Sequence, residues 1–313
     1  MLKTIPGRPT IGIISPAFIP VEERLRAGIH YLENLGCRVK RAKYLGQTDG
    51  YFAGTDAQRV ADIHQMFADP EVDLIICARG GWGGLRMLDQ LDYDLLRQHA
   101  KLLVGYSDVT SLQLAMWKKS RIPSLSGPMV GVEMGKGILP FTEKHFWGQV
   151  HNPQPLYEFG FSQTKTSVLI PGRAEGILLG GCLSLVSHLL GTPYQPDFSN
   201  TILFLEDVGE EPYKIDRYLA HLKQAGVFNQ INGLILGEFV DCEAEAGKPS
   251  FTLNEILQHY FSEAAYPVLM NFPYGHDAFK FSMPVGVNAV LDTDKKLLQL
   301  SNPNTSFAFS QND

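Results

Sequence analysis

Short, continuous apolar runs alternate with amphipathic segments through the first 130 residues, and this alternation constrains the fold more than any other feature of the chain. Runs such as 74–78 and 102–104 are apolar at consecutive positions, which is typical of strands buried on both faces of a sheet. Between such runs, segments such as 22–35 and 56–69 carry apolar residues at helical spacing. Strands that alternate with helices predict an α/β fold with a doubly wound parallel sheet, in which ligands bind beyond the carboxyl ends of the strands.

The pattern changes near residue 141. Residues 151–172 contain aromatic residues and prolines without a clear period, so we expect them to connect a first domain, 1–150, to a second domain, 173–313. The second domain again mixes strand-like and helix-like segments, and residues 281–301 are expected to form a hairpin around the sequence DTDKK. We therefore predict a smaller, mixed α/β carboxy-terminal domain.

Charge and cysteine usage argue against several function classes. The formal net charge of −6 disfavours a broad electrostatic grip on nucleic acid or on an anionic membrane. The chain contains neither a run of about 20 apolar residues nor the apolar core of a signal peptide, so a cytoplasmic location is expected. No H-E-x-x-H or C-x-x-C motif is present, and we expect neither metal nor cofactor. The four cysteines are far apart, which disfavours a disulfide framework: Cys37, Cys77, Cys182 and Cys242.

The sequence GYSD, 105–108, follows a strand-like run and precedes a helix-like segment, which places Ser107 in a strand-to-helix turn. One interpretation is that Ser107 or Asp108 caps the helix, since Ser and Asp are common at that position. The other is that Ser107 is a nucleophile on an elbow, although Val109 stands where the G-x-S-x-G pattern has its second glycine. Taken alone, the local sequence favours the cap.

The sequence ARGGWGG, 78–84, follows another buried strand. Its glycine spacing matches neither the dinucleotide fingerprint G-x-G-x-x-G nor a phosphate-binding loop with its lysine. Two interpretations remain open. The glycines form a tight turn that packs closely, or a backbone amide near Gly81 stabilises an oxyanion during catalysis.

Two later residues have the chemistry that a serine nucleophile requires. Glu206 ends the apolar run TILFLE, where it caps a turn or orients a histidine. His276 follows Gly275 in a loop, whereas most other histidines fall on expected helices, and it is either structural or the general base.

In this order, GYSD, FLEDVGEEPYKIDRYL and FPYGHD, together with IISPA, ARGGWGG and SGPMV, resemble the motifs of the L,D-carboxypeptidase family, which includes the microcin-immunity serine peptidases. The resemblance covers nearly the whole chain. It implies a catalytic triad in which Ser107 is the nucleophile, Glu206 the acidic member and His276 the base. It also implies that the backbone amides of Asp108 and of the turn at Gly81 bind the oxyanion.

The resemblance implies a flavodoxin-like amino-terminal domain that carries the serine, and a mixed, partly barrel-like carboxy-terminal domain that carries the glutamate and the histidine. It further implies a cytoplasmic homodimer that removes terminal D-alanine from murein tetrapeptides during peptidoglycan recycling. One alternative is a microcin-immunity hydrolase that cleaves peptide-nucleotide or acyl-sulfamoyl-adenosine conjugates. Another is a non-catalytic protein that binds a peptide in the same cleft.

A carboxypeptidase must also recognise a free carboxylate, and a guanidinium matches that geometry. Arg79, beside the glycines, and Arg217, in the IDR sequence, are the two candidates. Trp82 lies within the glycine-rich sequence and is expected either to cover the scissile bond or to pack against the protein.

Overall fold

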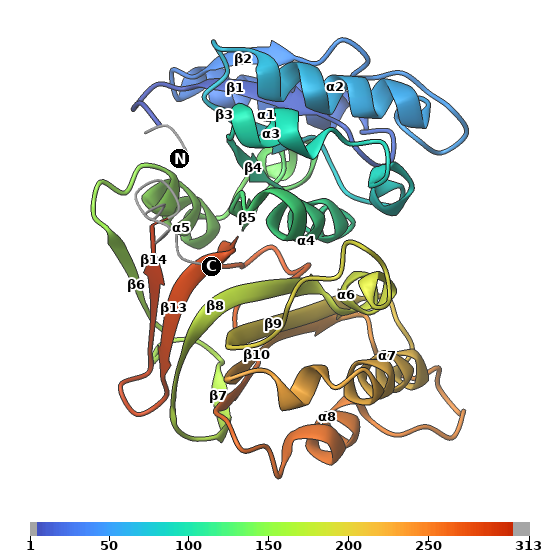
Figure 1. The fold of residues 1–313 in the computed structure, drawn as a ribbon, viewed down its shortest axis with the longest axis vertical. Coiled ribbons are helices and arrows are strands. Elements are labelled where there is room, and N and C mark those ends of the chain that lie inside the picture. The colour runs from blue at the N-terminus through green and yellow to red at the C-terminus, as the bar shows by residue number, and fades with distance from the viewer. Residues whose placement is uncertain (1–4, 303–313) are drawn as a thin grey trace.

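The computed structural model describes residues 5–302, which form two sheets flanked by helices (Figure 1). The first sheet has the strand order β12-β5-β4-β3-β1-β2, in which β1 to β5 are parallel and β12 pairs antiparallel with β5. The order 2-1-3-4-5 is that of flavodoxin, so the expected doubly wound, flavodoxin-like sheet is confirmed. Its strands are β1 (Thr10–Ile14), β2 (Arg38–Arg41), β3 (Leu74–Cys77), β4 (Leu102–Val104), β5 (Ser124–Ser126) and β12 (Met283–Val285).

Helices cover this sheet, and side chains cap the start of two of them. A capping box starts α2, because the Thr55 hydroxyl accepts from the N–H of Gln58 and the Gln58 side chain accepts from the N–H of Thr55. Helical spacing over residues 85–100 predicts one helix, but two short helices form there, because the Asp92 carboxylate accepts from two amides and starts a new helix. The helical elements are α1 (Glu22–Asn34), α2 (Asp56–Ala68), η1 (Gly84–Met87), α3 (Tyr93–Gln98), α4 (Val109–Ser120), η2 (Val130–Met134) and α5 (Pro140–Val150).

The second sheet has the order β6-β14-β13-β8-β9-β10-β11-β7 and is mixed. Four neighbours, β8 to β11, are parallel, and the remaining pairs are antiparallel. Among residues 5–302, β6 pairs only with β14 and β7 only with β11, so the described sheet has two open edges and is not a closed barrel, which limits the expected barrel-like character. The strands are β6 (Leu156–Gly160), β7 (Ser167–Ile170), β8 (Arg173–Cys182), β9 (Thr201–Val208), β10 (Gly233–Val240), β11 (Val268–Met270), β13 (Val287–Asp292) and β14 (Leu297–Ser301).

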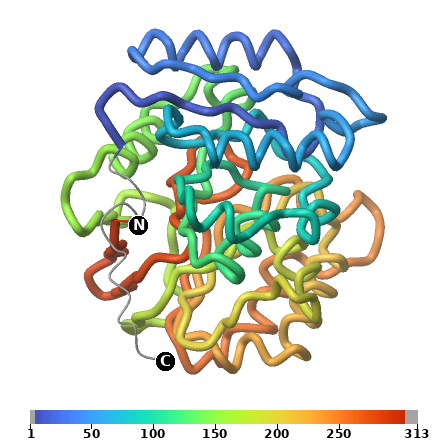
Figure 2. Tube along the Cα trace, turned by 45° about the horizontal axis from the view of Figure 1, so that its top comes forward, coloured from blue at the N-terminus to red at the C-terminus, as the bar shows by residue number. Residues whose placement is uncertain are grey.

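Two segments contribute strands to sheets that the sequence pattern did not assign them to. Residues 151–172, expected as a connecting region, supply β6 and β7 to the second sheet. The expected hairpin over 281–301 is formed by β13 and β14, but β12 leaves it and covers the edge of the first sheet at β5. Figure 2 shows this red carboxy-terminal segment running up beside the green segments of the first unit. Residues 1–4 and 303–313, at the ends of the two expected domains, lie outside the described residues.

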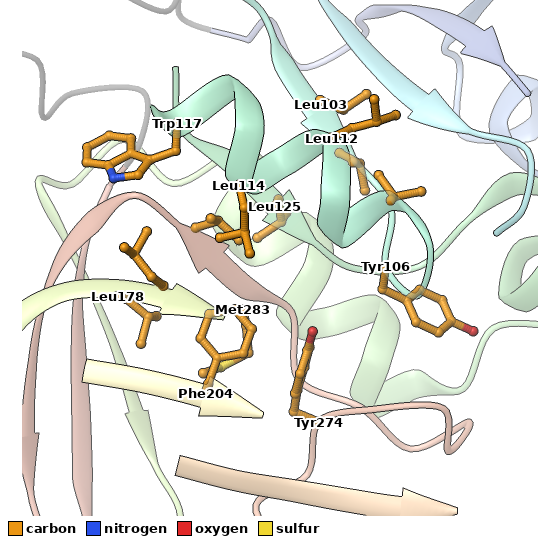
Figure 3. Close-up of a cluster of buried hydrophobic side chains, with 14 of the residues drawn as sticks. Leu103, Tyr106, Leu112, Leu114, Trp117, Leu125, Leu178, Phe204, Tyr274 and Met283 are labelled. Atoms are coloured by element: carbon orange, nitrogen blue, oxygen red, sulfur yellow. The ribbon is translucent and has the colours of Figure 1, made fainter. Parts of the chain in front are cut away.

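One buried helix joins the two units. All but two residues of α4 are buried, as expected of a helix that is covered on all sides. Figure 3 shows Leu114 of α4 and Leu125 of β5 in one cluster with Leu178, Phe204 and Met283, which come from β8, β9 and β12. Because the two units share this core, their relative position is set by packing. No helix within residues 5–302 combines the length and the apolar character needed to cross a bilayer.

The second unit carries its own helices, the first of which lies beside α4 and the longest two on the side away from the first unit (Figure 1). These are α6 (Leu183–Leu189), α7 (Pro212–Gln224), η3 (Val227–Asn229) and α8 (Leu253–Phe261). A second capping box, Thr252 with Glu255, starts α8.

Candidate active site

Ser107 lies in the turn between β4 and α4 with a left-handed backbone, at a φ of +62°. That conformation is strained for any residue with a Cβ, and it is typical of a nucleophile elbow. The helix cap is not observed, because Asp108 occupies the N-cap position of α4 and no side chain caps that helix end. Ser107 is half-buried, and a Cβ added to Gly80 would lie 3.2 Å from its Oγ. The structure therefore presents Ser107 as an elbow residue that faces the glycine turn.

The glycine-rich loop after β3 is tied directly to this elbow. The Asp108 carboxylate accepts a 2.8 Å hydrogen bond from the N–H of Gly84. Gly81 has a φ of +127°, and a Cβ there would lie 2.4 Å from the Phe18 ring, so a side chain is excluded at that point. No described residue accepts a hydrogen bond from the backbone N–H of Gly81 or of Asp108. Both amides are thus unpaired within residues 5–302.

Arg59, a residue that the sequence pattern did not single out, holds the same glycine-rich loop in place through hydrogen bonds. Its guanidinium is buried and donates to the carbonyls of Pro16 and Gly83, the latter at 3.2 Å. It also pairs with Asp56 at the start of α2. The only local signal was an arginine in the first turn of an amphipathic helix, a position at which arginine is ordinarily exposed.

Asp108 predicts a pH dependence of stability. Burial raises the pKa of its carboxyl from the usual 3.8 to about 6, against the opposing effect of the hydrogen bonds from Gly84 and Gly83 and of the Arg59 charge. The folded chain therefore holds the proton more tightly than the unfolded chain, and this stabilising contribution is lost as the pH rises from about 4 to about 6. We expect the free energy of unfolding, measured by urea denaturation, to fall over this range by about 3 kcal/mol more in the native protein than in Asp108→Asn.

The exposed Asp94→Asn serves as the control for this measurement, because Asp94 lies at the surface of α3 and pairs there with Arg97. Its curve of unfolding free energy against pH is expected to parallel that of the native protein. Equal pH dependence in the native protein and in Asp108→Asn would contradict the raised pKa.

Glu206, on β9, and His276, in the loop that follows β11, form a hydrogen-bonded pair. Glu206 is fully buried on β9, and its Oε2 accepts from the Nδ1–H of His276 at 2.7 Å. A proton on Nδ1 leaves the Nε2 of His276 free to accept another proton. Gly275 precedes the histidine with a φ of +138°, and a Cβ there would lie 3.1 Å from the Glu206 Oε2 and 2.9 Å from the carbonyl oxygen of Glu238. Only glycine allows the chain to bring His276 so close to the glutamate.

Ser107 and His276 line one cleft of about 260 Å³, although they come from different units of the chain. Arg79 also lines it, and its guanidinium donates to the carbonyl of Ile19 at 3.2 Å. The cleft has three cationic side chains and no carboxylate among the residues that line it: Val21, Arg24, Arg79, Gly80, Gly81, Tyr106, Ser107, Met129, Gly131, Val132, Lys136 and His276. Such a cleft suits an anionic ligand.

Two family models match this chain, the LD-carboxypeptidase N-terminal domain over residues 11–127 and the LD-carboxypeptidase C-terminal domain over residues 175–291. The chain belongs to the LD-carboxypeptidase family. The resemblance read from the motifs is therefore confirmed.

Three members of the LD-carboxypeptidase family illustrate its range. The probable murein peptide carboxypeptidase of Bacillus subtilis (strain 168) is 37% identical over 292 residues, which cover 92% of this chain and 90% of that protein. The microcin C7 self-immunity protein MccF of Escherichia coli is 26% identical over 328 residues, 93% of either chain. The crystal structure of muramoyltetrapeptide carboxypeptidase from Oxalobacter formigenes has a TM-score of 0.83 and 31% identity, and covers 93% of this chain and 97% of that one.

Within this LD-carboxypeptidase fold, two of the expected substrate-binding residues are not among those that line the cleft. Trp82 is 37% exposed and is not among the residues that line it. Arg217 lies on α7, where its guanidinium contacts the rings of Tyr213 and Tyr218. No group of three His, Cys, Asp or Glu side chains within residues 5–302 is arranged to hold a metal ion.

Sequence reasoning missed Arg24, Lys136 and Tyr106 as cleft residues. Arg24 lies on α1 and Lys136 follows η2, and neither belongs to a motif that marks a site. Tyr106 stands beside Ser107 in the GYSD sequence, and its ring meets that of His276 edge to face, with centroids 5.0 Å apart. Adjacency to the serine was the only signal that could have identified it.

Proposed function

We propose that this chain is a serine carboxypeptidase that releases the terminal D-alanine of murein tetrapeptides through Ser107, His276 and Glu206. The observation that supports the proposal is that a strained serine and a glutamate-bonded histidine line the same cleft. The family relationship supports the reaction type, and the names of the relatives from Bacillus subtilis and Oxalobacter formigenes support the murein peptide. The expected homodimer and cytoplasmic location stay predictions.

Acyl transfer proceeds in two steps in this proposal. The Nε2 of His276 takes the proton of the Ser107 hydroxyl as Oγ forms a bond to the carbonyl carbon of the L,D-peptide bond. The carbon–nitrogen bond then breaks, and His276 passes the proton to the leaving amine of D-alanine. Water, deprotonated by the same histidine, attacks the acyl carbon and releases Ser107 with its proton restored. Glu206 stabilises the imidazolium that forms in each step.

The oxyanion requires donors that are free to bind it. The backbone amides of Gly81 and Asp108 are unpaired among the described residues, and they flank Ser107 from the glycine turn and from the start of α4. Amide donors held in place by the surrounding structure stabilise a developing negative charge without reorganising during the reaction. We assign the oxyanion to these two amides.

Arg79 is the best-placed group for the terminal carboxylate. It lines the cleft, is only half-exposed, and is held by its hydrogen bond to Ile19 and by the Phe18 ring, 5.7 Å from its Cζ. A guanidinium held in this way loses little further freedom when it binds a carboxylate. Arg24 and Lys136 then face the other anionic groups of the peptide.

A direct test is the release of D-alanine from purified murein tetrapeptide, followed by mass spectrometry. We expect release from the native protein, and roughly 100-fold slower release from a tetrapeptide whose terminal carboxylate is a carboxamide, since that analogue leaves the Arg79 charge unpaired. In Arg79→Gln the KM for the natural peptide should rise while the preference for carboxylate over carboxamide largely disappears.

The alternative substrate class is tested in parallel. Relatives in this family include the microcin C7 self-immunity protein MccF, so an aminoacyl-sulfamoyl-adenosine is the second substrate offered. Hydrolysis of that compound without release of D-alanine from the tetrapeptide would replace the murein assignment. Failure to turn over either compound, with the peptide bound unaltered, would favour the non-catalytic alternative.

A further inference from the structure

A buried cluster of charged and polar groups lies directly behind His276. The ammonium of Lys280 donates to Glu133 Oε1 at 2.7 Å, and the two side chains are only 1% and 7% exposed. The Tyr106 hydroxyl donates to the same Oε1 at 2.8 Å, and the Lys280 ammonium lies 3.6 Å from the centre of the Tyr106 ring. That ring in turn packs against His276. Figure 3 shows Tyr106 with its hydroxyl directed away from the core cluster.

The cluster connects residues that come from distant parts of the chain. Glu133 lies in η2, beside the first sheet, whereas Lys280 belongs to the loop that follows His276 and leads into β12. Helix α5 holds the same loop: Thr142 accepts from the N–H of Lys280 at 3.0 Å, and Gln149 donates to the carbonyl of Ser282 at 2.7 Å. The loop that presents His276 is therefore fastened to the unit that carries Ser107.

A contribution to stability is a weak explanation for this ion pair. Removing two charges from water costs about as much as their attraction returns, and well-packed apolar residues often replace such pairs without loss. Burial alone would raise the pKa of Glu133, but Lys280 and the hydrogen bonds from Met129 and Tyr106 lower it, so the glutamate remains an anion beside the cation. What the pair does supply is a fixed, electrically neutral support behind the Tyr106 ring.

We propose that Glu133 and Lys280 form a positioning pair for the general base, which acts through Tyr106 to orient the His276 ring and to keep the charge behind it balanced. The inference rests on the proposed function of His276. An uncompensated charge at either position would change the energy of the imidazolium. The other charged or titratable groups around the histidine and its cleft include the acidic, phenol and thiol groups of Glu206, Asp277, Glu238, Tyr274 and Cys182, and the cations of Arg24, Arg79 and Lys136.

Lys280→Met tests the proposal, because it keeps the length and apolar stem of the side chain and removes the charge. With the Glu133 anion uncompensated, we expect kcat to fall by about 100-fold at an unchanged KM. The acid limb of kcat/KM should move to higher pH by about one unit, since a nearby anion raises the pKa of a histidine. Lys280→Arg, which keeps the charge, should restore the native limb. A folded Lys280→Met variant with native kcat, or with an unmoved acid limb, would overturn the proposal.

Glu133→Gln keeps the proposal testable should Lys280→Met fail to fold. It leaves the cation uncompensated, so its acid limb is expected to move in the opposite direction, to lower pH. A limb that moves upward or stays in place in the folded variant would overturn the proposal. Lys40→Met is the matched control, because Lys40 pairs with Asp69 at a site that is far from this loop in the sequence. This variant should have native kinetics.

Labelling by diisopropyl fluorophosphate separates this inference from the proposed function. The reagent requires only an activated serine and no murein peptide. Slower labelling of Lys280→Met than of the native protein supports the positioning pair whichever substrate is correct. No labelling of the native protein at Ser107, together with D-alanine release by Ser107→Ala, would instead remove the proposed function itself.

Discussion

Ser107→Ala is expected to abolish D-alanine release, with kcat lower by about 10⁶-fold, because no other group at the elbow can form the acyl-enzyme. The strained turn and the cleft should otherwise be unchanged, so the variant should still bind the tetrapeptide with native affinity. The loss of turnover is measured by mass spectrometry of free D-alanine, and binding by calorimetry.

Ser120→Ala is the matched control for this prediction. Ser120 lies at the far end of the same helix, where its hydroxyl donates to the carbonyl of Tyr93 at 2.7 Å, remote from the cleft. Its turnover should be native. Release of D-alanine by Ser107→Ala at more than a few per cent of the native rate would show that another residue is the nucleophile.

Ser107→Gly extends the same prediction to stability. Glycine adopts the left-handed conformation without the steric cost of a Cβ, about 1–2 kcal/mol, although it loses more conformational entropy on folding, about 0.5–1 kcal/mol. We therefore expect Ser107→Gly to be inactive yet more stable than Ser107→Ala by about 1 kcal/mol in urea denaturation. A glycine variant less stable than the alanine variant would contradict the strain attributed to a φ of +62°.

Glu206→Gln has the second largest expected effect, a fall in kcat of about 10⁴-fold. The carboxamide can donate a hydrogen bond to Nδ1, which would put the proton on Nε2 and leave the histidine unable to accept the serine proton. It would also provide no charge to stabilise the imidazolium. Because the two side chains have the same shape, thermal unfolding should change far less than kcat.

Asp207→Asn is the control for that substitution. Asp207 is the next residue on β9 and is also buried, but its carboxylate accepts from the backbone N–H of Ser184 at 2.8 Å and from the Cys182 thiol. It should alter stability more than turnover. Equal losses of kcat in Glu206→Gln and Asp207→Asn would indicate a general effect of charge removal in this strand instead of a specific pairing with His276.

Much of the site could be predicted because the fold class constrains where chemistry can occur. In a parallel sheet, the residues that follow β3 and β4 come to the same edge, so the glycine turn and Ser107 had to be neighbours once the alternating pattern was recognised. Periodicity also located most helices and strands, since burial of one face imposes a spacing on the residues. Whether Ser107 capped a helix or formed an elbow was open, because both conformations use the same residue type at the same place.

The sequence by itself predicted the doubly wound parallel sheet of the first domain, the family and, through the family resemblance, the three residues of the proposed triad. Only the tertiary structure decided that Ser107 has a left-handed backbone, that Arg79 lines the cleft while Trp82 and Arg217 do not, and that β12 returns to the first sheet. Only the tertiary structure showed, too, that Glu133 pairs with Lys280, 147 residues later in the chain. The reason is that local spacing sets the face on which a residue lies, whereas a contact between distant segments depends on how whole elements pack, which no local pattern encodes.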